Sequence, residues 1–201
     1  MSKKSAKVNH HILPVLSERW SPRAFADTPV EVEKLKQIFE AARWAASSNN
    51  EQPWRFIICH KGEKGYSEMF AGFNKWNQKW AYTAPVIVTT CVKRSFTKNE
   101  NPNRHAWHDL GLAMGNLLAQ ATHLGLFVHQ MAGIETEVLY ENLNINQQKY
   151  EIVSMFTIGY QSFERLNELD ERYHESEHAE RTRKKLSEIV FDAKFDTPID
   201  W

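Results

Sequence analysis

The stretch 108–124, HDLGLAMGNLLAQATHL, constrains the fold of this chain more than any other segment. It has helical spacing and is small and apolar on nearly every side, with Gly111 and Gly115 four residues apart. A helix without a long polar face must be covered on most of its sides. Two arrangements achieve that in a chain of 201 residues. The helix lies either at the centre of a monomer's core or at a subunit interface, and the spacing does not choose between them.

Apolar segments of strand character alternate with helical segments along the chain. The strand segments are WRFIICH, PVIVTTCV, LFVHQMAG and EIVSMFTIGY. This alternation predicts one sheet with helices around it, and therefore a single α/β or α+β domain. The sequence also predicts a short helix over 10–18 and a capping box formed by Thr28, Pro29 and Glu31. Residues 161–180 are polar and acidic-rich, and we expect them to form a solvated connection.

The overall composition excludes several classes of partner. Lys+Arg and Asp+Glu both number 25, so no net charge attracts nucleic acid or an anionic membrane. Mean hydropathy is −0.57, and no apolar run approaches the roughly 18 residues that a membrane-spanning helix needs. The first sixteen residues are basic but contain no apolar core of a secretory signal. The expected location is therefore the cytoplasm.

Common catalytic and nucleotide-binding motifs are missing from the sequence. It contains no GxGxxG after a strand, no GxxxxGK[ST], no GxSxG and no CxxC. His105, His108 and Asp109 are the nearest approach to metal-ligand spacing, and they keep a metal-dependent hydrolase open as a hypothesis from another functional class. We predict no metal site and name no catalytic side chain.

Three polar clusters have residue types suited to an anionic, heteroaromatic ligand. In RWSPRAF, the alternation of Arg19, Ser21 and Arg23 points two guanidinium groups and a hydroxyl to one side of an extended segment. The segment SSNNEQPW, residues 47–54, carries amide donors and acceptors. A third cluster, basic, begins at Arg181. Taken singly, each cluster has an ordinary structural explanation: a solvated loop for the first, which that cluster alone would favour, turn chemistry for the second and a solvated helix start for the third.

The order and spacing of these clusters resemble the FMN-dependent nitroreductase family. Members show R-x-S-x-R-x-F, matched here at 19–25, and AARxAxSxxNxQPWxF, matched at 41–56. A helix of the form D-x-G-x-A-x-x-N-L with a following short G-L segment, a strand ending in Gly-Tyr and a terminal R-K-x-L-x-E-I-V are also matched, at 109–125, 159–160 and 183–190. The resemblance covers roughly residues 12–201.

The resemblance implies an FMN site, residue by residue. Arg19 and Ser21 would serve the ribityl-phosphate end, and Arg23 would approach the N1/O2 edge of the isoalloxazine. A cation there would stabilise the negative charge of the reduced flavin. Asn50 would reach the ribityl chain or pyrimidine edge. The remaining implied contacts are Gln52 beside Asn50, a backbone N–H from the loop Met131-Ala132-Gly133 to flavin N5, and a phosphate clamp formed by Arg181 and Arg183.

The resemblance also implies a fold and an assembly. The family fold is α+β, with a mixed central sheet flanked by helices, in an interlocked homodimer. We therefore expect one domain over 1–201, with an N-terminal tail over 1–10 and an extended tail over 191–201 on the partner subunit. Phe195 and Trp201 would anchor that tail, and the helix over 108–124 would lie across the two-fold axis.

The implied activity is an FMN-dependent oxidoreduction. NADPH or NADH would reduce FMN, and a nitroaromatic or quinone-like acceptor would then take the electrons in a ping-pong cycle. Solvent can supply the protons. The alternative within the same fold is a non-catalytic FMN-binding or flavin-storage protein. The sequence carries no feature that separates NADH from NADPH or identifies the physiological acceptor.

Overall fold

A computed structural model describes residues 4–199 of the chain. Its centre is a four-stranded sheet in the order β1-β2-β4-β3, in which every neighbouring pair is antiparallel. The four strands coincide with the four apolar segments of the sequence: β1 (Trp54–His60), β2 (Val86–Lys93), β3 (Phe127–Met131) and β4 (Tyr150–Gly159).

The prediction of a mixed sheet is wrong for the described strands. β2 and β3 run in the same direction, but they are not neighbours because β4 lies between them and pairs with both in the opposite direction. The long helical connection from β2 to β3 allows either placement, so sequence pattern could not decide it.

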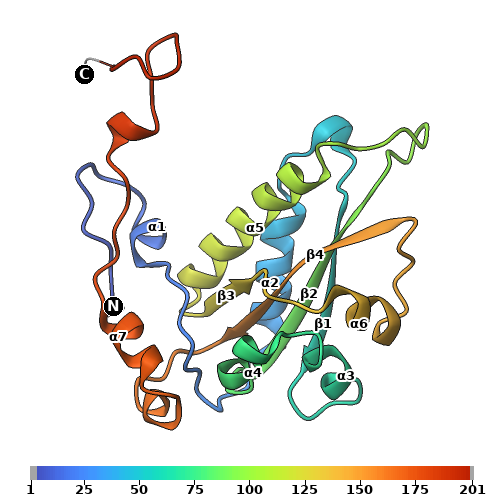
Figure 1. Ribbon diagram of the computed structural model, residues 1–201, viewed down its shortest axis with the longest axis vertical. Helices are drawn as coiled ribbons and strands as arrows, with labels where there is room; N and C mark the ends of the chain where they lie inside the picture. The colour runs from blue at the N-terminus through green and yellow to red at the C-terminus, as the bar shows by residue number, and fades with distance from the viewer. Residues whose placement is uncertain (1–3, 200–201) are drawn as a thin grey trace.

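Helices cover both faces of the sheet (Figure 1). Val86 and Val88 of β2 face one core with α2 and α5, whereas Ile87 faces a second core with α3 and α4. Because β2 is covered on both faces, it is buried along nearly its whole length. The helices are α1 (Pro14–Glu18), α2 (Val32–Arg43), α3 (Tyr66–Phe70), α4 (Lys75–Ala81), α5 (Ala106–His123), α6 (Thr136–Asn142) and α7 (Arg172–His178), with short 3₁₀ turns η1 (Ser48–Asn50), η2 (Arg165–Glu168) and η3 (Leu186–Glu188).

Two predicted helix starts are wrong. α1 begins only at Pro14, because the residue before a proline avoids the helical region, and Leu13 accordingly has ψ 134°. The capping box at 28–31 does not form. Glu31 is extended, and its carboxylate accepts the Tyr160 hydroxyl instead, so a tertiary contact replaces the local cap.

α5 ends where the sequence indicates. Gly125 has φ +75°, its N–H donates to Thr122 O, and Leu126 N–H donates to Ala121 O. This pair of bonds is the Schellman motif, which favours glycine at that position. The turn delivers the chain directly from α5 into β3.

Residues 161–180 are not the solvated connection that their composition predicts. Leu166, Leu169 and Tyr173 are buried in the core that also holds α3 and α4. Glu177 is buried as well, at 2% exposure. The segment packs because its apolar residues recur on one side of η2 and α7, while most of its charged side chains other than Glu177 are exposed.

The C-terminal stretch departs from the body of the chain. In Figure 1 it rises past α1 and ends apart from the sheet and its helices. Leu186 and Ile189 are 43% and 58% exposed, and Phe195 is 84% exposed. In the described part of the chain, the backbone hydrogen bonds of 185–199 run only within that stretch. Trp201 lies outside the described residues.

No helix among residues 4–199 is both long enough and apolar enough to cross a membrane.

Candidate functional site

The segment 19–25 has the alternation that its sequence predicts. Trp20, Pro22 and Ala24 are buried, whereas Arg19, Ser21 and Arg23 on the other side are partly exposed. The end of this segment is hydrogen-bonded to the residues that follow β4. Ala26 N–H donates to Tyr160 O, and Ser162 N–H donates to Ala24 O. The arginines are therefore presented from a segment fixed to the sheet.

Arg19, Arg181 and Arg183, here called the arginine cluster, come together from opposite ends of the chain. Burial lowers the pKa of Arg19, and the positive charge of Arg183 lowers it further. Burial also lowers the pKa of Arg181, with repulsion from Arg19 and Arg183 adding to the effect. Within residues 4–199, no carboxylate lies within ion-pair distance of any of the three.

The cluster's hydrogen bonds go to neutral groups. Arg181 Nη1 donates to Ser17 O at 2.6 Å and to Lys4 O at 3.2 Å, which also holds the N-terminal segment in place. Arg19 Nη1 donates to Ser21 Oγ at 3.3 Å, and Arg183 Nη1 donates to Thr182 O. Unbalanced positive charge of this kind favours an anionic ligand.

Arg23 is held differently from the cluster. Its backbone N–H donates to Glu177 Oε1 at 3.1 Å, and its Nη1 lies 3.4 Å from the same oxygen and 3.1 Å from Ser176 Oγ. Burial raises the pKa of Glu177, and the adjacent Arg23 opposes that rise. The role of Glu177 could not be predicted from sequence, because it lies 154 positions away from Arg23 along the chain.

His129 ties the 19–25 segment to β3. Its Nδ1–H donates to Pro22 O at 2.9 Å, and its ring packs on Trp80 with 4.4 Å between centroids. Burial lowers the pKa of His129 to about 4, and the positive charges of Arg23 and Arg19 lower it as well. The hydrogen bond to Pro22 O acts in the opposite direction, because it favours the charged imidazole. The neutral imidazole thus places the arginine-bearing segment beside the strand that leads to Met131.

Lowering the pH from 6.5 to 4 should destabilise the fold through His129. The folded-state pKa, about 4, lies below the ordinary value, so the unfolded chain binds more protons in this range. The free energy of unfolding should therefore fall as the pH falls, by up to about 3 kcal/mol. Urea denaturation at pH 7 and pH 4.5 measures this loss. The variant H129Q should lose less stability over the same interval; an equal loss would contradict the assignment.

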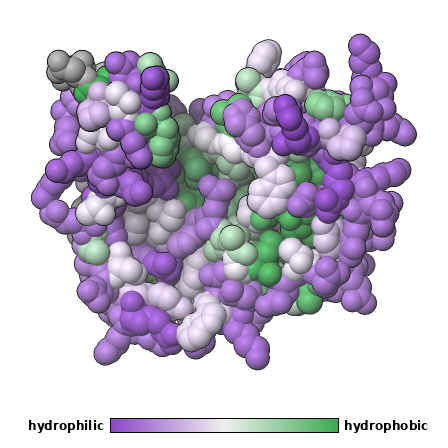
Figure 2. Space-filling model, turned by 45° about the horizontal axis from the view of Figure 1, so that its top comes forward, coloured by the Kyte–Doolittle hydropathy of each residue, from purple (hydrophilic) through white to green (hydrophobic). Residues whose placement is uncertain are grey.

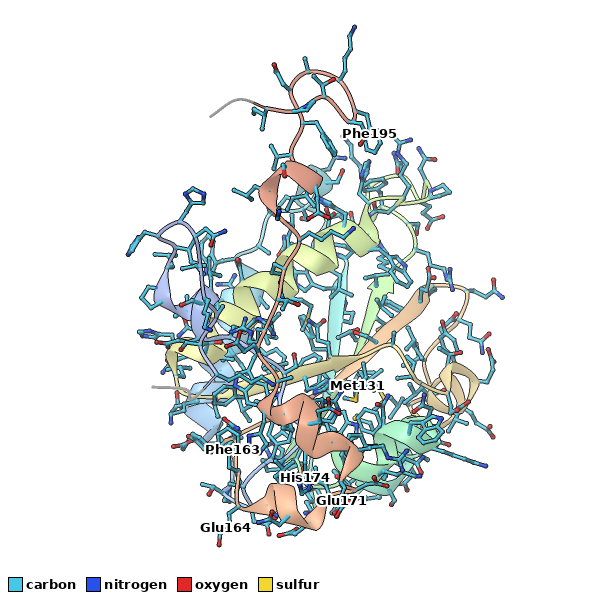
Figure 3. The ribbon with its side chains drawn as sticks, turned by 60° about the vertical axis from the view of Figure 1, so that its left-hand side comes forward. Met131, Phe163, Glu164, Glu171, His174 and Phe195 are labelled. Atoms are coloured by element: carbon cyan, nitrogen blue, oxygen red, sulfur yellow. The ribbon has the colours of Figure 1, made fainter. Side chains whose placement is uncertain are left out.

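The loop 131–133 is fixed by the start of α4. Met131, labelled in Figure 3, is buried, whereas the next residue, Ala132, is exposed. Gly133 O accepts from Asn74 N–H at 3.1 Å and from Asn77 Nδ2 at 2.8 Å. A Cβ on Gly133 would stand 2.4 Å from Asn74 Nδ2, so adding a side chain here would require the Asn74 side chain to shift. Among residues 4–199, no acceptor takes the Gly133 N–H.

The turn 47–53 is a strained loop anchored on α5. Asn49, Asn50 and Gln52 all have φ between 51° and 53°, a region that only asparagine among these tolerates readily. Side-chain oxygens help to hold the turn: Ser48 N–H donates to Asp109 Oδ2 at 3.0 Å, and Gln52 N–H donates to Ser47 Oγ at 3.0 Å. Asp109, buried at 2% exposure, is thus a support for this loop.

The chain does not bring the 47–53 turn to the arginine cluster. The turn contacts Asp109 in the first turn of α5, whereas the 19–25 segment contacts Phe127 and His129, just past the other end of that helix. An 18-residue helix is about 27 Å long. The arginine cluster and the amide residues Asn50 and Gln52 therefore form two groups, one at each end of α5. The loop 131–133 lies instead against the start of α4.

The residues proposed for a metal-dependent hydrolase do not converge. His108 Nδ1 lies 3.2 Å from Asp109 Oδ1, while His105 Nε2 contacts Arg104. In the described ranges, no three histidine, cysteine or carboxylate side chains gather as a metal site would require. The geometry therefore gives this hypothesis no support.

The family model described as Nitroreductase family matches residues 16–75 and 67–160. The chain belongs to the nitroreductase family. The match includes the 19–25 segment, the 47–53 turn, α5 and the 131–133 loop. It ends before Arg181, so that part of the arginine cluster lies outside the matched residues.

Known proteins of this family resemble the chain over most of its length. A crystal structure described as an oxidoreductase containing FMN is 29% identical, with a TM-score of 0.89, over 98% of this chain and all of that one. The major NAD(P)H-flavin oxidoreductase of Aliivibrio fischeri is 24% identical over 76% of this chain and 88% of its own length. The oxygen-insensitive NAD(P)H nitroreductase of Salmonella typhimurium is 22% identical over 78% and 91%, respectively.

Proposed function

We propose that this nitroreductase-family chain is an FMN-dependent oxidoreductase that passes electrons from NADH or NADPH to a small, electron-poor acceptor. The arginine cluster is the observation that carries the proposal. Three guanidinium groups form a site suited to a phosphate dianion, since no carboxylate of residues 4–199 lies within ion-pair distance of them and two have pKa values lowered by burial and mutual repulsion. Family membership and relatives described as flavin oxidoreductases, nitroreductases or FMN-containing proteins support the same conclusion.

The described residues fit the rest of FMN as well. Ser21 lies beside Arg19 for the ribityl-phosphate end, and Arg23 supplies a cation for the pyrimidine edge. The Gly133 N–H is a backbone donor that no acceptor among residues 4–199 takes, so it is available to a ring atom of the flavin. When bound, FMN would supply two-electron chemistry, while these residues would orient it and adjust its charge.

Asn50 and Gln52 complete this site only if a second copy of the chain contributes them. Because the turn and the cluster lie at opposite ends of α5, one chain cannot place both on one mononucleotide. Two α5 helices packed antiparallel about a two-fold axis would set the turn of each chain beside the cluster of the other. We therefore propose a homodimer with two FMN sites, each built from both subunits.

The outer face of α5 has the properties of such an interface. Trp107 and Leu112 are 53% and 41% exposed, although the helix is among the most apolar in the chain. Gly111 and Gly115 lie on the same face, and a Cβ on either would meet nothing within 4 Å in the single chain. Glycine inside a helix costs about 1 kcal/mol relative to alanine. Close approach of a partner helix accounts for that cost, whereas packing within one chain does not.

Figure 2 shows a hollow between two lobes with apolar side chains along its base. The exposed Leu186, Ile189 and Phe195 of the C-terminal stretch would be covered by lying on the partner subunit, as a tail exchanged between chains. The proposed tail exchange thus gives these apolar side chains the partner that their own chain does not provide.

The visible spectrum of the protein as purified tests the proposed function. Bound FMN, identified by chromatography after release, should be bleached by NADH or NADPH and recover its colour when menadione or a nitroarene is added. Flavin that binds but resists reduction would support the storage alternative instead. A protein that binds no FMN when supplied with it would contradict both.

A further inference from the structure

Glu177 is a buried carboxylate to which the proposed function so far gives no role. It lies on α7, and its side chain is 2% exposed. Burying a carboxylate is costly unless it is paired and hydrogen-bonded. Arg23 supplies both: a backbone N–H at 3.1 Å and a guanidinium nitrogen at 3.4 Å from Glu177 Oε1.

The last turn of α7 holds Arg23 through several groups at once. Ser176 Oγ lies 3.1 Å from Arg23 Nη1, and the Tyr173 ring centroid lies 5.5 Å from the guanidinium carbon. Lys4 secures this turn by donating from Nζ to Ser176 O and Glu177 O, at 2.6 and 2.9 Å. Arg23 is thus held by α7, and the backbone of that turn of α7 is held by Lys4.

The side chain of Glu177 lines a small cavity. A pocket of about 180 Å³ is lined by Lys4, Phe163, Glu177 and His178. The rings of Phe163 and His178 stack with 5.9 Å between centroids. In Figure 3, Phe163 lies in the segment beside α7, and His174 lies on the helix itself. The carboxylate is therefore enclosed by α7 and by the segments packed on it, and Arg23 is the guanidinium that it contacts.

We propose that Glu177 is a positioning residue that fixes the orientation of Arg23 and offsets its charge beside the flavin. The proposal rests on the proposed function, which places Arg23 near the N1/O2 edge of FMN. A paired arginine presents a weaker positive field than an unpaired one. Since reduced flavin carries negative charge at that edge, Glu177 holds the reduction potential below the value that Arg23 alone would set.

Replacing Glu177 by glutamine tests this role, because Gln keeps an acceptor for the Arg23 N–H and removes the charge. In E177Q, we expect the bound FMN to have a higher midpoint potential at pH 8. A tenfold gain in affinity for reduced over oxidised flavin corresponds to about 30 mV for a two-electron couple. R23A should shift the potential in the opposite direction. E175Q is the matched control, since Glu175 is exposed on the same helix, and it should leave the potential unchanged.

If the role of Glu177 is purely structural, the variants should show a different pattern of midpoint potentials. E177D keeps the negative charge, so its potential should stay near that of the wild type even where FMN binding weakens. Equal shifts in E177D and E177Q would overturn the proposal. It would also be overturned if R23A lowers the potential while E177Q matches E175Q, although the proposed function would then stand. A wild-type protein that binds no FMN would contradict the proposed function itself.

Discussion

Placing leucine at Gly115 should yield a monomer that loses FMN. In a single chain, the position is open, because a Cβ there meets nothing within 4 Å and leucine is a good helix former. The folded chain should therefore be at least as stable as the wild type outside the dimer. At an interface between two α5 helices, the same side chain would overpack two symmetric contacts, each at a cost of about 1–3 kcal/mol.

Sedimentation and flavin content measure this effect together. G115L should sediment as a monomer and retain FMN weakly, with far-UV circular dichroism unchanged. E141L, which adds an exposed leucine on α6 away from α5, is the control and should remain a dimer with full flavin. A dimeric, fully yellow G115L protein would show that α5 does not pack on its copy.

Removing Arg19 and Arg183 together should abolish retention of FMN. Each charged hydrogen bond to the phosphate is worth about 1.5–3 kcal/mol, so a single R183A change should raise the Kd about 10- to 150-fold. The two losses need not add, because the guanidinium groups also repel each other.

Repulsion among the guanidinium groups predicts a second effect of R183A, on the stability of the protein without FMN. Without ligand, R183A should be no less stable than the wild type, since it relieves the charge that lowers the pKa of Arg19. Fluorescence titration with FMN and thermal melts of the apoprotein measure the two effects. K184A, at an exposed neighbouring position, should change neither. Weakened binding with an equally destabilised apoprotein would instead make Arg183 a structural residue.

Much of the fold follows from local pattern. The four strands coincide with four apolar runs, and the Schellman turn at Gly125 ends α5 where glycine allows it. Patterns of this kind rest on contacts within a few residues. The burial of 161–180 and the failed capping box at 28–31 depend on contacts with distant segments, which composition does not encode.

In the candidate site too, some residues can be predicted from local sequence motifs and others cannot. The arginines and amides could be named from their motifs, and the alternation of Arg19, Ser21 and Arg23 predicted which side they face. The roles of Glu177, His129 and Asp109 could not be predicted, since each acts on a segment far away in sequence. Nor could the sequence show that the two polar groups lie at opposite ends of α5.

A mixed-dimer experiment tests the two-chain site most directly. One chain carries R19A and R183A, the other carries N50A and Q52A, and each homodimer should bind FMN poorly. If every site joins the cluster of one chain to the turn of the other, the heterodimer has one intact site. It should bind one FMN per dimer with wild-type affinity. A heterodimer that binds FMN as weakly as the two mutant homodimers would mean that the cluster and the turn of each site come from one chain. That result would contradict the account.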